Sequence, residues 1–398
     1  MTHSNRFIRL QQPINRPGRV PALVGLLFIV VILLPTNCRH KISENATDLA
    51  SIDSSPYHND MARFLAGMPV SADSQPGSLT KSAAWQRHRS AMDGFWKAVE
   101  HQHLDLIQPW QKEHLADLTA GRTALYLLSG ADFLNLASFF PDSQRYVMLA
   151  LEASDRLPDP RKLTNAEITR SLEAIRSVTG NIGARNYFMS ASMNRYLNGN
   201  FSFRGTTPVI LIFAARLGFQ IHSIESIVLQ DDGTIRPATL QENPVGSRIR
   251  VYRPGDTQLR EIVYLQVRLS DANVSPQSKS GRYLHSLGPV NVMLKSAVYL
   301  LHMQQFTGVR DFVLQQAALI VQDDSGVPYS FLKNKDWQVR LYGSYQAPVR
   351  LKGTGYYPQP ELAADYKQTA TPLAFQYGYG TLRPDGQSNL LIAQRLTQ

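Results

Sequence analysis

The sequence predicts an α/β domain with a mixed, partly parallel sheet flanked by helices, preceded by an N-terminal membrane segment. The membrane segment is an uncharged run at positions 20–34 that follows a basic start. The sheet is indicated by a compact apolar run at 123–129, a short buried helix at 133–140 and a second apolar run at 145–152. A strand, a helix and a buried strand in this order form a βαβ unit, which implies parallel pairing covered by helices. A degenerate Rossmann-like sheet is one form of this prediction.

Residues 1–38 are interpreted as an export signal or a signal-anchor. Four arginines and no acidic residue occupy the first 19 positions, and Val20 to Leu34 carries neither a charge nor a hydrogen-bonding side chain. This combination is typical of an export signal. With Pro35 and Thr36 the run reaches the lower limit of about 17 residues for a bilayer crossing, so cleavage and retention are both open. We expect the domain to face the periplasm or the exterior, membrane-anchored or secreted.

Cys38 is the only cysteine in the chain, and it lies four residues past the apolar run. The lipid-modified cysteine of a bacterial lipoprotein lies at such a place. The usual motif has Leu at −3 and a small residue at −1, where this chain has Pro35 and Asn37. Lipidation of Cys38, a plain anchor and an incidental thiol therefore stay open. A single cysteine does exclude an internal disulfide and thiolate zinc sites of the usual spacing.

The net charge of +10 points to acidic partners or to an ordinary solvated surface. Outside the cytoplasm a basic surface favours anionic lipid headgroups or acidic cell-wall polymers. A nucleic acid partner is not expected, because no run of Lys and Arg with interleaved aromatic residues occurs.

The chain divides into the membrane segment, a polar linker at 39–56 and a single extracytoplasmic α/β domain at 57–398 with a helical N-terminal part at 57–120. Within that part, one helix begins near Asn59 or Asp60, a second spans about 81–106, and Pro109 separates the second from a short helix ending near 118. Further helices are predicted near 164–178, 185–197, 207–217, 289–304 and 309–315, and further strands at 219–229, 248–253, 261–269, 317–322, 338–345 and 390–395.

Three stretches resemble a family of uncharacterised exported bacterial proteins. They are Ser129-Gly-Ala-Asp-Phe-Leu with a following Phe-Phe-Pro, the stretch Val321-Gln-Asp-Asp-Ser-Gly-Val-Pro328, and Ser388-Asn-Leu-Leu. The likeness covers most of residues 57–396. It implies an exported location and one shared fold, and it implies no particular chemistry.

The strongest candidate positions for chemistry follow the two strands of the βαβ unit. Ser129 and Asp132 come after the first strand and Glu152 after the second, at the sheet edge where parallel folds bind ligands. The interval from Ser129 to Glu152 resembles the spacing by which nucleotide-binding folds place an acidic residue on the ribose of their ligand. A Gly-x-Gly-x-x-Gly loop is absent and only Gly130 stands in the turn, so no cofactor is predicted. Asp132 is equally well explained as a helix cap.

Asp323 and Asp324 form a second candidate. Adjacent carboxylates at a strand end can bind a hard cation or act as acid and base, but Asp-Asp-Ser-Gly is also what a tight turn uses. The motif His-Glu-x-x-His is absent, and no metal site is expected. Seven late tyrosines can line a sugar or peptide groove, or can pack sheet edges and loops; they are Tyr342, Tyr345, Tyr356, Tyr357, Tyr366, Tyr377 and Tyr379.

Three functional hypotheses follow. The leading one is a non-enzymatic envelope protein that binds a partner or an anionic surface component, because the serine-nucleophile and phosphate-loop patterns are absent. The rival is an extracytoplasmic hydrolase or transferase in which the five candidate residues after the predicted strands converge on one pocket. The third is a methyltransferase-like fold without its cofactor, which would show the strand order of that class and lack the glycine loop. The rival's residues are Ser129, Asp132, Glu152, Asp323 and Asp324.

Overall fold

The computed structural model describes residues 56–74, 76–118, 123–185, 199, 201–351, 353–383 and 386–396. The expected membrane segment, Cys38, nearly all of the linker and most of the helix expected at 185–197 lie outside these ranges. No helix within the described ranges is long and apolar enough to cross a bilayer.

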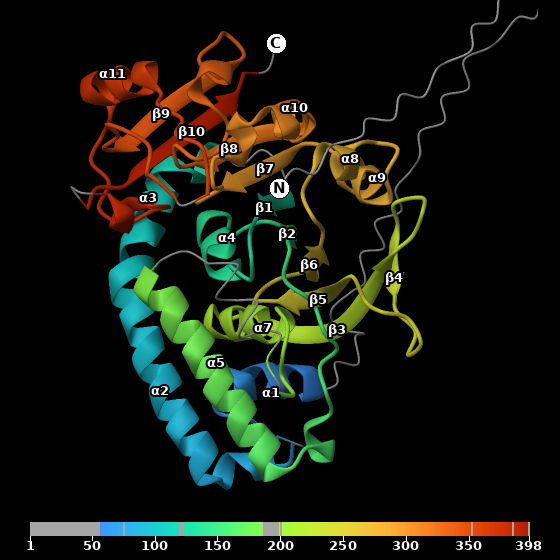
Figure 1. Ribbon diagram of the computed structural model, residues 1–398. Coiled ribbons are helices and arrows are strands. Elements are labelled where there is room, and N and C mark those ends of the chain that lie inside the picture. Colours follow the sequence, from blue (N-terminus) through green and yellow to red (C-terminus); the bar gives the residue numbers. More distant parts are fainter. Residues whose placement is uncertain are drawn as a thin grey trace, which may run out of the picture. The chain divides into compact units, whose positions relative to one another are not determined.

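The described strands form one mixed sheet in the order β4-β3-β5-β6-β2-β1-β7-β8-β10-β9 (Figure 1). The five central strands, from β6 to β8, run parallel, and the strands on either side pair antiparallel. This arrangement confirms the α/β class and the mixed, partly parallel sheet. The strands are β1 Thr123–Leu127, β2 Arg145–Ala150, β3 Gln220–Leu229, β4 Ile235–Pro237, β5 Gly246–Tyr252, β6 Arg260–Gln266, β7 Val290–Leu294, β8 Ala317–Gln322, β9 Trp337–Gly343 and β10 Asn389–Arg395.

The winding of the sheet reverses between β1 and β7. From β1 the chain adds β2 and then β6 on one side, and it returns to the other side of β1 with β7 and β8. At such a switch point the loops that follow the two strands diverge, and a crevice forms beyond the carboxyl ends of the strands. Without the antiparallel extension β3–β5, the seven remaining strands have the order 3-2-1-4-5-7-6 in chain numbering, with the last strand, β10, reversed.

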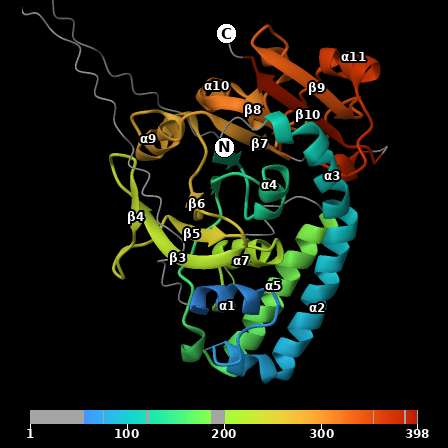
Figure 2. The same ribbon diagram turned by 180° about the vertical axis from the view of Figure 1, so that it is seen from behind.

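Helices cover both faces of the sheet (Figures 1 and 2). Alternate residues of β1 enter two cores: Tyr126 packs into the core shared with α1 to α7, and Leu125 packs into the core shared with α9 to α11. Both faces of β1 are therefore buried. The helices are α1 Pro56–Leu65, α2 Ala83–Val99, α3 Asp105–His114, α4 Phe133–Phe139, α5 Asn165–Arg185, α7 Thr207–Arg216, α8 Asp271–Val274, α9 Lys279–Ser286, α10 Thr307–Gln316 and α11 Pro360–Thr369.

Two sequence-based expectations are wrong. The helix expected at 289–304 is replaced by strand β7 and a series of turns. A central parallel strand is buried on both faces, so it is a short continuous apolar run that periodicity does not distinguish from a buried helix. Pro109 does not end a helix but lies inside α3. Helix α3 directly follows a π-helical segment at Glu100–Leu104. The wide π turn shifts the backbone hydrogen bonding just before the proline ring.

Candidate functional site

The loops that follow β1, β7 and β8 meet at the carboxyl edge of the sheet, on the switch point. They contribute Asp132 after β1, Lys295 after β7, and Asp323 and Asp324 after β8. All four side chains are buried. These strands pair side by side as β1-β7-β8, so parallel pairing accounts for the gathering of charged residues far apart in the sequence.

A buried ion pair spans the switch point. Lys295 Nζ lies 2.9 Å from Asp132 Oδ2, and each side chain is 1% exposed. Asp132 also caps α4, because its Oδ1 accepts from the backbone N–H of Asn135 at 3.2 Å and from the Asn135 side chain at 2.8 Å. The Tyr126 hydroxyl lies 3.4 Å from both Asp132 Oδ2 and the Lys295 carbonyl. Burial and the charge of Asp132 hold the pKa of Tyr126 well above its usual value, so the phenol stays a donor.

Asp323, Asp324 and Ser325 hold the loop that follows β7. Asp323 Oδ2 accepts from the backbone N–H of Ser296 at 3.1 Å, and Ser325 Oγ accepts from that of Ala297 at 2.7 Å. Asp324 Oδ2 accepts from the Tyr299 hydroxyl at 2.8 Å. The Asp-Asp-Ser motif thus ties the β7 loop to the end of β8.

Asp323 and Asp324 each accept several hydrogen bonds from other groups of the chain. Asp323 Oδ1 also accepts from the backbone N–H and hydroxyl of Ser325, the pattern of an Asx turn. Asp324 Oδ1 accepts from Arg383 and from the Asn389 side chain. The turn interpretation of this motif therefore accounts for part of its bonding, and the link to the β7 loop accounts for the rest.

Backbone strain is concentrated in the same two loops. All the described non-glycine residues with positive φ lie there: Leu128 at 61° after β1, and Ser296, Val298 and Tyr299 at 56°, 57° and 55° after β7. A branched residue such as Val298 is a genuine outlier in this region. Each such residue costs on the order of 1–3 kcal/mol and persists only where surrounding contacts fix it. In the β7 loop, Asp323 and Ser325 hold the backbone N–H groups of Ser296 and Ala297, and Asp324 holds the Tyr299 hydroxyl.

The other two predicted residues lie apart from this network. The Ser129 hydroxyl donates to the carbonyls of Gly130 and Leu149, at 2.9 and 3.3 Å, and is not activated by a base. Glu152 is buried at the end of β2, and its Oε1 has no hydrogen-bond partner among the described residues. The structure therefore brings the two aspartate sites to the adjacent strands β1, β7 and β8, while Ser129 and Glu152 take no part in the network.

The described residues contain no group of three His, Cys, Asp or Glu side chains able to hold a metal ion. Lys295 and Tyr126 are the site residues that sequence reasoning missed. Lys295 was hidden because the segment containing it was expected to be helical, and Tyr126 because it lies inside an apolar strand. A correct strand assignment at 290–294 would have placed Lys295 at the carboxyl edge of the sheet.

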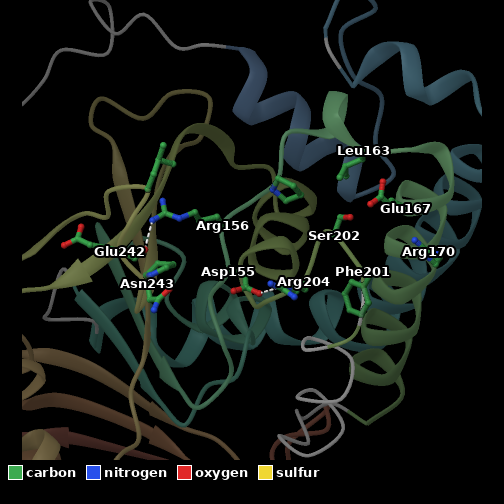
Figure 3. A pocket seen from close by; sticks show the side chains of 13 residues that line it. Asp155, Arg156, Leu163, Glu167, Arg170, Phe201, Ser202, Arg204, Glu242 and Asn243 are labelled. Carbon is green, nitrogen blue, oxygen red and sulfur yellow. Dashed lines mark hydrogen bonds and ion pairs between the residues drawn. The ribbon is translucent and has the colours of Figure 1, made fainter.

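A pocket of about 510 Å³ opens beside the end of β2 (Figure 3). Its charges are largely matched within the protein: Arg204 pairs with Asp155 at 2.7 Å, and Arg156 donates to backbone carbonyls that include that of Glu242, at 2.9 Å. Glu167 accepts from the backbone N–H of Thr164 at 2.7 Å as part of a helix-capping box. These contacts fix the walls and leave few charged groups unmatched.

A second pocket, of about 570 Å³, lies beyond β8 and is called the aromatic pocket below. Four rings from two chain segments line it, together with polar residues and three prolines. Its volume is within the range usual for ligand sites. The lining residues include Tyr329, Phe331, Tyr356, Tyr357, His302 and Arg310.

Comparison with known proteins adds no relative. No family model matches the chain, and neither a curated protein nor a solved structure matches it. The function is therefore argued from the site alone.

Replacing Lys295 with Met is expected to lower the free energy of unfolding by about 3–5 kcal/mol, because Asp132 is left buried and unpaired. Urea unfolding measures the effect. The double variant Lys295→Met/Asp132→Asn keeps the α4 cap and removes both charges, so it is expected to recover part of the loss. Lys97→Met on the exposed side of α2 is the control, expected within about 0.5 kcal/mol of wild type. If Lys295→Met lowers the free energy of unfolding by less than about 1 kcal/mol, the ion pair contributes little to the stability of the fold.

The stability of the protein is expected to depend on pH through Asp323. Burial first, and the charge of Asp324 second, raise its pKa to about 6, against hydrogen bonds from Ser325 and Ser296 that lower it. The unfolded carboxyl loses its proton near pH 4, so the folded state binds the extra proton between the two values. Stability relative to Asp323→Asn should therefore fall as pH rises from about 4 to about 6. If the difference in stability between wild type and Asp323→Asn stays constant from about pH 4 to about pH 6, the raised pKa of Asp323 is contradicted, whatever the size of that difference.

Proposed function

We propose that this chain is a non-enzymatic, membrane-tethered binding protein whose methyltransferase-like domain has no room for a cofactor. The observation that carries the proposal is the Lys295–Asp132 ion pair, which is buried across the switch point where such domains hold their ligand. The protein's own charges occupy the position that a ligand would need.

The strand order supports the methyltransferase-like part of the proposal. Order 3-2-1-4-5-7-6 with a reversed seventh strand is the topology of the Rossmann-like methyltransferases. The methyltransferase-like hypothesis from the sequence expects this strand order. This is a likeness of fold alone, and fold does not determine function. Function has to be argued from the residues at the carboxyl edge.

Those residues do not fit an adenosyl cofactor. The loop after β1 has one glycine, Gly130, where close approach to a cofactor needs several, and every residue from 129 to 140 is buried. Glu152 stands at the position of a ribose-binding acid, and its buried Oε1 has no partner among the described residues, so the Glu152→Gln variant below tests this position directly. Burial of this loop and of the ion pair supports a domain that works without the cofactor.

The enzyme alternative is weakened by the bonding of its carboxylates. A general acid or base must reach the proton that it transfers in a substrate. Asp132, Asp323 and Asp324 are buried and bonded to groups of this chain, and Gly378 packs against Asp323 so closely that a side chain there would clash. Asp132 caps α4 and pairs with Lys295, Asp323 holds the backbone of Ser296, and Asp324 holds the Tyr299 hydroxyl.

The location and the partner belong to the same proposal. The basic N-terminus and the apolar run at 20–34 support attachment to a membrane with the domain outside the cytoplasm. The positive net charge supports an anionic lipid or an acidic cell-wall component as the partner. Lipidation of Cys38 is a further way in which the chain could be attached.

The purified full-length chain is expected not to bind S-adenosylmethionine or S-adenosylhomocysteine in isothermal titration calorimetry. The reason is that the crevice is filled by Lys295 and Asp132. Glu152→Gln is the informative variant: a heat of binding in wild type that is lost in Glu152→Gln would contradict the proposal, because it would assign the buried acid to a ribose.

A periplasmic-type reporter, alkaline phosphatase, fused after residue 60 is expected to be active, since the apolar run directs the following chain out of the cytoplasm. Intact mass of the membrane fraction shows whether Cys38 carries lipid. Deletion of residues 1–38 should abolish both reporter activity and membrane association. An active cytosolic reporter in the same position, such as β-galactosidase, would overturn the location.

A further inference from the structure

The late tyrosines divide into two groups in the structure. Tyr342, Tyr345, Tyr366 and Tyr377 are buried in the two cores, as expected for packing residues, and Tyr379 is buried as well, with its hydroxyl donating to the Ser296 carbonyl at 2.9 Å. Tyr356 and Tyr357 instead line the aromatic pocket with Tyr329 and Phe331. Tyr356 is 44% exposed and Phe331 39% exposed, which makes them two of the few large apolar side chains left in contact with solvent. Aromatic rings kept half-exposed around one cavity indicate a surface for a ligand with a flat apolar face.

Two guanidinium groups lie on these rings. Arg310 stands 4.3 Å from the centre of the Phe331 ring, and Arg350 stands 4.0 Å from that of Tyr356. Within the described part of the chain neither arginine forms an ion pair with a carboxylate, unlike Lys333 nearby, which pairs with Asp365 at 2.9 Å. The rings therefore have positive charge beside them that the protein does not neutralise. This charge favours an anionic group on the ligand.

Polar atoms without partners lie in the same wall. Arg310 Nε and His302 Nε2 have no hydrogen-bond partner in the described structure. Burial lowers the pKa of His302 to about 4, against backbone hydrogen bonds to Asp324 and Gly326 that raise it, so its ring is neutral at physiological pH and leaves Nε2 as an acceptor. Buried polar groups are nearly always satisfied, and unsatisfied ones call for a missing partner. Glu361 at the rim adds an acceptor whose charge the N-terminus of α11 offsets.

We propose that the aromatic pocket binds an acidic saccharide, a pyranose that carries a carboxylate. Such a ring has an apolar C–H face that stacks on aromatic side chains, hydroxyls that donate to His302 Nε2 and Glu361, and an anion that pairs with Arg310. An acidic peptide would match the charge but would lack the rigid ring and its hydroxyls. The inference rests on the proposed function, because it names the anionic surface component that the exported domain would meet.

The test is calorimetric titration of the full-length chain in detergent with tetramers of galacturonate and of mannuronate, and with a neutral galactose tetramer. One of the acidic tetramers is expected to bind at least about tenfold more tightly than the neutral one, as one charge-assisted hydrogen bond provides. Phe331→Ala and Tyr356→Ala should each weaken binding about tenfold without changing the Tm, because both side chains are half-exposed. Leu106→Ala, an exposed apolar residue on α3, is the control and should bind as wild type.

Arg310→Gln separates a charge role from a packing role. It is expected to bind the acidic and neutral tetramers equally, with a Tm that shows the domain still folded. The proposal is overturned if neither acidic tetramer binds, if the neutral tetramer binds equally well, if the aromatic variants bind as wild type, or if a glutamate oligopeptide binds as tightly. None of these results depends on the adenosyl-cofactor titration or on the reporter fusion, so the proposed function can fail or hold separately.

Discussion

A buried ion pair sets the architecture of the carboxyl edge of the sheet. Lys295 follows β7 and Asp132 follows β1, so their contact joins the two strands whose loops diverge at the switch point. Two opposite charges removed from water are stable only when paired and further hydrogen-bonded. Asp132 meets this condition because it also caps α4. The loop positions after both strands therefore depend on this contact.

The strained β7 loop and the Asp323-Asp324-Ser325 motif form a second layer around the pair. Bonds from this motif hold Ser296 and Tyr299, two of the three residues with positive φ in this loop. The motif resembles a catalytic pair in sequence but serves to hold backbone. The proposed binding site is the aromatic pocket, which residues after β8 help to line and where side chains remain half-exposed and partly unpartnered.

The α/β class with a mixed, partly parallel sheet could be predicted from the sequence, but the contacts of the candidate aspartates could not. Apolar runs of strand length predicted β1 and β2, and the rule that ligands gather at carboxyl ends singled out Asp132 and Asp323. The strand β7 was mistaken for a helix, because Val292, Leu294 and Ala297 fit helical spacing as well as a buried strand. Since Lys295 follows that strand, the partner of Asp132 could not be found. The bonding of Asp323 to Ser296 depends on a pairing of β7 with β8 that local patterns do not encode.

The most direct measurement of the central claim is the reactivity of individual lysines toward an acylating reagent, followed by mass spectrometry of the native full-length chain. A lysine whose side chain is buried in an ion pair is not accessible to the reagent, so Lys295 should stay unmodified under conditions in which the exposed Lys97 and Lys112 are labelled completely. Labelling of Lys295 at the rate of those surface lysines, in protein shown to be folded, would mean that the crevice is open and that the filled-site account is wrong.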